Sequence, residues 1–171
     1  MNIHAIGQNM LFGKIGHFLI ILAFATSLAA CLAYLFATIY RDDTKKSISW
    51  VSFGRKMFIL HAVAVLGIVA TFLFIIHGHF FEYKYAWQHS SKALQVQYLL
   101  SCFWEGQEGS FMLWSFWHCV LGWIIIWRSR KWEAPVMCVI SFAQFCLATM
   151  LLGIYFFGHK VGSSPFVLLR N

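Results

Sequence analysis

Charged side chains are scarce in this sequence of 171 residues, and that scarcity excludes an ordinary soluble domain. Charged residues make up 11% of the chain and hydrophobic residues 60%, whereas soluble domains carry roughly 25% charged residues. The formal net charge is +7, but the lysines and arginines gather in short segments between apolar runs. The sequence therefore argues against a nucleic-acid-binding protein and indicates a membrane protein.

Several patterns typical of catalysis or metal binding are also missing. The chain has no glycine-rich phosphate-binding loop, no Ser-His-Asp arrangement and no Cys/His spacing typical of a zinc site. Its five cysteines form no Cys-x-x-Cys pair, and most lie within apolar runs, as small buried residues do. The sequence thus predicts neither a nucleotide-driven pump nor a dedicated metal site.

Long apolar runs are abundant, and each approaches the roughly 20 residues that a membrane-spanning helix needs. They predict an all-α polytopic membrane protein with a single membrane domain over residues 1–171. The predicted transmembrane helices cover residues 15–40, 57–80, 109–127 and 135–157. Between the second and third, Ser90-Ser91-Lys92 is typical of a helix start. It precedes a predicted short amphipathic helix over Ala93–Tyr98, lying on the membrane surface outside the spans.

Basic residues between the predicted spans indicate the orientation of the chain. Eight of the thirteen lie in two predicted loops: Arg41, Lys45, Lys46, Arg55 and Lys56 in one, and Arg128, Arg130 and Lys131 in the other. The positive-inside rule places both loops in the cytoplasm. The two termini and the segment 81–108 are then expected on the external side.

Two motifs lie in and directly after this external segment. The first is Tyr85-Ala86-Trp87-Gln88-His89-Ser90-Ser91, and the second is Ser101-Cys102-Phe103-Trp104-Glu105-Gly106-Gln107-Glu108-Gly109-Ser110-Phe111-Met112-Leu113-Trp114. They resemble the Y-x-x-x-H-S-[NS] segment and the W-G-[GQH]-E-G-S-L-L-L-W signature of the CcmF/CcsA-type cytochrome c haem lyases, in the same order and at a similar spacing. Glu105 stands where a small residue is common in that family. The matching positions are Trp104, Gly106, Glu108, Gly109, Ser110, Trp114 and His89.

The resemblance implies the amino-terminal part of a haem lyase in the bacterial inner membrane, with both termini periplasmic. Such a protein is a component of c-type cytochrome maturation that handles haem and assists its covalent attachment to apocytochrome c. The implied partners are a haem chaperone, apocytochrome c and a thiol-reducing factor, beside the lipid bilayer. The implied cofactor is haem.

The family's tryptophan-rich haem-binding segment, W-G-x-x-W-x-W-D, does not occur in this sequence. The haem-ligand histidines of that family also fall beyond the part that this chain resembles, so the resemblance assigns no haem ligand here. This segment alone is therefore expected to provide scaffold and docking surface, and its own enzymatic activity stays open. Glu108 is expected to bond backbone amides near Gly106 and to fix the entry of the chain into the membrane.

His118 is the candidate haem ligand within this chain, because an intramembrane histidine usually faces the bundle interior and has a partner. A hydrogen-bonded packing role is the other interpretation. The alternative function is a small membrane electron-transfer subunit that binds haem b and quinone and uses His118 with His77 or His159. His61, roughly 7 Å from the level of His118, is a poor second ligand. A structural or transport subunit without a cofactor is a third interpretation.

Overall fold

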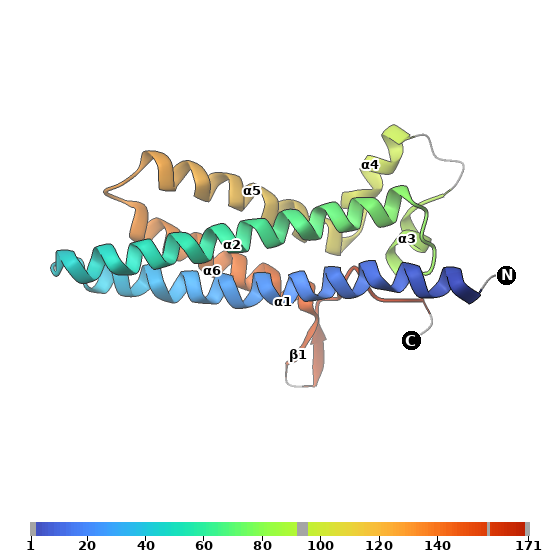
Figure 1. Cartoon of the computed structure of the whole chain (residues 1–171), viewed down its shortest axis with the longest axis horizontal. Coiled ribbons are helices and arrows are strands. Elements are labelled where there is room, and N and C mark those ends of the chain that lie inside the picture. Colours follow the sequence, from blue (N-terminus) through green and yellow to red (C-terminus); the bar gives the residue numbers. More distant parts are fainter. Residues whose placement is uncertain (1–2, 92–95, 157, 170–171) are drawn as a thin grey trace.

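A computed structural model describes residues 3–91, 96–156 and 158–169 and shows a bundle of long helices (Figure 1). Within these ranges four helices are long and apolar enough to cross a membrane. They are α1 (Ile3–Ile39), α2 (Thr44–His77), α5 (Gln107–Arg128) and α6 (Glu133–Leu152). Two shorter helices, α3 (Lys84–His89) and α4 (Val96–Glu105), connect α2 to α5. The prediction of an all-α polytopic membrane protein is confirmed.

The helix α1 packs against both α2 and α6, while α5 packs against α6 and α2. The buried face of α1 carries small residues spaced three or four apart: Ala23, Ser27, Ala30, Ala33 and Ala37. Small side chains let neighbouring helices approach closely, as membrane bundles require. Large apolar residues on the outward faces, such as Phe18 and Val139, are 62% and 68% exposed, as expected for contact with lipid.

The helix α1 begins at Ile3, well before the predicted start at residue 15. Two other helix boundaries differ from the prediction for a local reason. The predicted loop from 41 to 56 is much shorter, because Asp43 caps α2 and its carboxylate accepts a hydrogen bond from the Lys46 amide at 3.2 Å. Arg55 therefore lies inside α2. The fourth span was predicted to reach 157, but α6 ends at Leu152, because Gly153 adopts the left-handed conformation with φ 71°. Residue 157 lies outside the described residues.

The sequence did not predict the two short strands that follow α6. The strands β1 (Ile154–Phe156) and β2 (His159–Val161) pair antiparallel and project from the side of the bundle (Figure 1). The predicted helix start at Ser90-Ser91-Lys92 and the predicted helix over Ala93–Tyr98 fall partly on residues 92–95, which lie outside the described residues. The described part of that segment is helical from Val96 onward.

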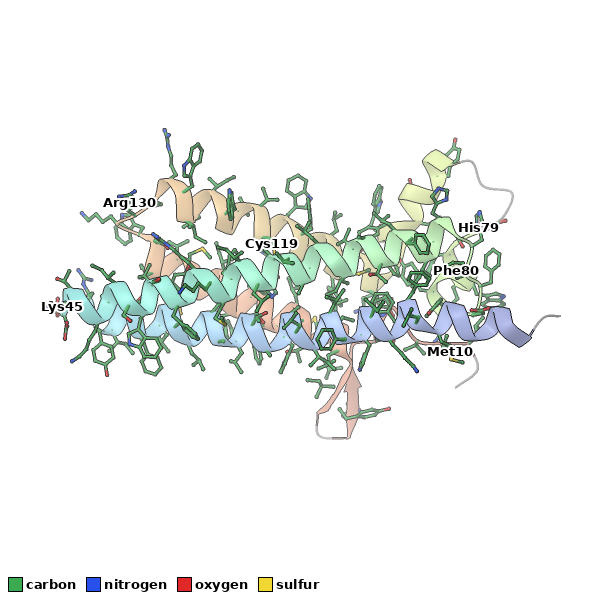
Figure 2. The ribbon with its side chains drawn as sticks, viewed as in Figure 1. Met10, Lys45, His79, Phe80, Cys119 and Arg130 are labelled. Atoms are coloured by element: carbon green, nitrogen blue, oxygen red, sulfur yellow. The ribbon has the colours of Figure 1, made fainter. Side chains whose placement is uncertain are left out.

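The two ends of the bundle differ in chemistry. Lys45 and Arg130 lie at one end, which we call the basic end, and His79 and Phe80 lie at the opposite end (Figure 2). The carboxyl-terminal segment also reaches that opposite end, where the Lys84 amide donates to the Val167 carbonyl at 2.9 Å. The two predicted loops rich in lysine and arginine thus lie at the same end of the bundle. This is expected when consecutive spans run in opposite directions.

Candidate functional site

The candidate site is the junction of α4 and α5 at Gly106, together with α3, which packs on it; we call it the elbow. α4 ends at Glu105 and α5 begins at Gln107, with Gly106 in an extended conformation between them. A side chain on Gly106 would meet the Tyr85 ring, at 2.5 Å from its nearest carbon. A side chain on Gly109 would overlap the Phe103 carbonyl and approach the Tyr85 hydroxyl at 2.7 Å. Both glycines are therefore needed for the close contact of α4, α5 and α3.

The Tyr85 hydroxyl holds the elbow together. It accepts a hydrogen bond from the Gly106 amide at 2.8 Å and lies 3.1 Å from the carbonyl oxygens of both Cys102 and Phe103, to which it donates. These backbone groups lack helical partners because the helix is interrupted at Gly106. Burial of the ring raises the pKa of Tyr85 to about 12, so the hydroxyl keeps its proton at neutral pH. Tyr85 thus joins the two motifs, because these hydrogen bonds connect residues that are 17 to 21 positions apart in the sequence.

His89 extends the elbow towards solvent. Its ring lies 4.5 Å from the Tyr85 ring, and its Nδ1 lies 3.9 Å from the Glu105 carboxylate, an ion pair whenever the imidazole is protonated. His89, Cys102 and Glu105 line an open pocket of about 400 Å³ that draws on both motifs. Burial, followed by the nearby Glu105 charge, raises the pKa of the Cys102 thiol, so it is not a ready nucleophile.

The remaining motif residues have separate places. The Ser110 hydroxyl donates to the Trp104 carbonyl at 3.1 Å, which ties the first turn of α5 to the end of α4. Trp104 and Trp114 are 47% and 63% exposed, as suits side chains at a membrane boundary. The expected bond from Glu108 to backbone amides is not seen among the described residues, because Tyr85 takes the Gly106 amide instead. Glu108 is half-buried in the first turn of α5, where the helix dipole stabilises a carboxylate.

His118 lies outside the elbow, about 16 Å along α5 from the first residue of that helix. One turn further on, a side chain at Gly122 would overlap the Phe58 ring of α2, so His118 lies at the level of α2 near His61. His77 is sixteen residues beyond His61, about 24 Å along α2. This separation is too large for His77 and His118 to hold one porphyrin, and His159 is exposed in β2. Neither His77 nor His159 is therefore placed to share one porphyrin with His118.

The sequence reasoning missed two features. In the sequence Tyr85 is only the first residue of a motif, and its one signal is an aromatic hydroxyl about twenty residues before two glycines. The second is a buried polar contact between α5 and α6. The Gln144 amide donates to the Ser115 carbonyl at 2.8 Å and lies 3.2 Å from the Cys119 sulfur. Across the bundle, the buried His61 Nδ1 lies 2.9 Å from the Ala23 carbonyl, linking α2 to α1.

Removing the Tyr85 hydroxyl should weaken the elbow, which gives a test of its role. In Tyr85→Phe the Gly106 amide loses its partner, at a cost of about 2 kcal/mol. The folded pKa of about 12 exceeds the ordinary value of 10.0, so the stabilisation is complete below pH 10 and is lost as the pH rises towards 12. Thermal melting in detergent should therefore show a stability difference at pH 8 that shrinks at pH 11.

The exposed Tyr155, 71% accessible in β1, provides the matched control, and Tyr155→Phe should leave the melting temperature unchanged at both pH values. Equal melting of the wild type and Tyr85→Phe at pH 8 would show that the hydroxyl does not hold the elbow.

The structure therefore brings His89, Gly106 and Gly109 against Tyr85 and joins Ser110 to Trp104 at the same elbow. It leaves Glu108 beside them without a hydrogen bond in the described residues, and it places Trp114 and His118 further along α5. Comparison with known proteins gives no independent assignment: no family model, curated protein or solved structure matches this chain.

Proposed function

We propose that this chain is a membrane component of c-type cytochrome maturation, in which the elbow takes part in handling haem or its acceptor. The observation that carries the proposal is the Tyr85 hydroxyl, which bonds the Gly106 amide and the Phe103 carbonyl. Through it, the two motifs that resemble those of CcmF/CcsA-type haem lyases form one packed unit. The residues of this chain that carry the resemblance therefore lie together in three dimensions.

The orientation of the bundle is part of the proposal. The basic end would face the cytoplasm of a bacterium by the positive-inside rule, and the elbow would face the periplasm. A haem chaperone, apocytochrome c and a thiol-reducing factor would then meet the chain at the elbow. Because neither His77 nor His159 lies where it could share a haem with His118, this chain would supply a docking surface, and we assign no attachment step to its residues.

One observation favours the alternative of an electron-transfer subunit with haem b and quinone. The His118 Nδ1 is buried and has no hydrogen-bond partner in the described part of the chain. A b-type absorbance spectrum from the purified chain, lost in His118→Ala, would support that alternative. A colourless preparation with intact cytochrome c maturation in His118→Ala would favour the main proposal.

Glu108→Ala tests the main proposal at a residue outside the hydrogen bonds that hold the elbow together. Its carboxylate is half-buried beside Gly106, and no hydrogen bond to it occurs within the described residues, so it is available to a partner. We expect haem attachment to a reporter apocytochrome, in cells with the complete maturation system, to fall roughly tenfold, as for loss of one charged hydrogen bond. The measurement is haem-stained cytochrome per unit of immunoblotted chain.

Gln107→Ala is the control, because Gln107 is the exposed neighbour at the start of the same helix. It should mature the reporter normally. Normal maturation in Glu108→Ala as well, at wild-type abundance, would remove the support for a functional elbow.

A further inference from the structure

A second pocket lies at the basic end, far from the elbow. It has a volume of about 680 Å³ and is formed by the end of α1, the start of α2, the α5–α6 turn and the start of α6. Arg130, at its rim, lies at the same end as Lys45 (Figure 2). Elements far apart in the sequence therefore meet here, which makes the pocket a feature of the folded bundle.

The pocket carries excess positive charge. Four basic residues and one acidic residue line it: Arg41, Arg55, Arg130, Lys131 and Glu133. Arg55 is neutralised by Glu133, through hydrogen bonds of 2.6 Å and 2.5 Å. Within the described residues, the other three basic side chains have no carboxylate within ion-pair distance. Three uncompensated cations around one cavity favour binding of an anion.

The same lining is amphipathic. Ile48 and Val51 of α2 provide an apolar wall, and Ile48 is 64% exposed. Trp132, 62% exposed at the rim, is typical of the boundary between headgroups and acyl chains. The Ser52 hydroxyl adds a neutral donor to the lining. A ligand with a charged phosphate and an attached acyl chain fits both parts of this surface.

We infer that this pocket binds a phosphate-bearing anion, supplied by the headgroup of an anionic phospholipid. Guanidinium groups bind phosphate through paired hydrogen bonds, so Arg41 and Arg130 would hold the phosphate and Lys131 would add a point charge. Basic pockets between membrane helices bind anionic headgroups in this manner. The inference is independent of haem handling, since it uses the opposite end of the bundle.

The test is native mass spectrometry of the purified full chain in detergent, titrated with phosphatidylglycerol, phosphatidylcholine or inorganic phosphate. We expect one phosphatidylglycerol per chain to be retained at least tenfold more strongly than phosphatidylcholine. Arg41→Gln/Arg130→Gln should weaken it roughly 30-fold, from the contribution of two basic residues. Lys45→Gln/Arg128→Gln removes two charges outside the pocket lining and should change it less than about twofold.

The exposed Lys131→Gln is a second variant that should fold normally even if the double variant does not, with a loss of roughly fivefold. Binding of inorganic phosphate that depends on Arg41 and Arg130, without retention of phosphatidylglycerol, would overturn the lipid as the source. Equal losses in the pocket and control variants, or no preference between the two lipids, would overturn the site itself.

Discussion

Gly109→Ala is expected to disrupt the elbow and to lower the melting temperature by roughly 6–12 °C. The added methyl group would overlap the Phe103 carbonyl and lie 2.7 Å from the Tyr85 hydroxyl. The Phe103 carbonyl belongs to the backbone of α4, and the Tyr85 hydroxyl is held by its hydrogen bonds to the elbow. Because neither group can move away, α4 and α5 must separate. We put the cost at about 3 kcal/mol, at the upper end of overpacking effects, which corresponds to that shift for a chain of this size.

Gly67→Ala is the matched control, because it makes the same substitution in a helix. There the methyl group would meet the end of the Leu19 side chain at 2.9 Å, and a flexible side-chain end can shift where a backbone carbonyl cannot. Alanine also favours helix over glycine by about 1 kcal/mol, so this control should melt within about 2 °C of the wild type. If both variants melt alike, the elbow is not tightly packed.

The second large effect is expected from breaking the ion pair that joins α2 to α6. Glu133 is 2% exposed, and its carboxylate bonds the Arg55 guanidinium at 2.6 Å and 2.5 Å. Arg55→Leu leaves that carboxylate buried without its partner, which costs roughly 3–5 kcal/mol in fully buried pairs. The Arg55 side chain is 40% exposed, so we expect about 2 kcal/mol and a fall of roughly 4–8 °C in melting temperature.

A double-mutant cycle separates the pair from general loss of charge. Arg55→Leu/Glu133→Leu removes both charges and should recover most of the stability, whereas Lys56→Leu at the exposed neighbouring position should have little effect. Additive losses in the double variant would mean that the two side chains do not act as a pair.

The membrane-spanning helices could be predicted from hydropathy, because apolar runs of that length have few other uses. Their ends could be predicted less well. The α2 start at Thr44 depends on one cap, Asp43, within a polar segment that resembles a loop. The α6 end depends on Gly153, which was hidden within a continuous apolar run. The three-residue strands of the hairpin are too short to give a periodic signal.

For the site, the glycines and the histidine of the motifs could be identified, but their contacts could not. Tyr85 reaches Gly106 only because α3 folds back onto the junction of α4 and α5, a tertiary arrangement that no local pattern specifies. The same holds for Arg55 and Glu133, which lie 78 residues apart. Local periodicity predicts which face of a helix is buried. It does not predict the contacts between helices, because those depend on how the helices pack.

The proposal depends most directly on the elbow and the basic end lying on opposite sides of a membrane, with the elbow outside. Single cysteines at Gln88 and Lys45, both exposed, test it in a background whose five native cysteines are replaced by alanine. We expect a membrane-impermeant maleimide to label Gln88→Cys in intact spheroplasts and Lys45→Cys only after lysis. Labelling of both before lysis, or of Lys45→Cys alone, would contradict the account.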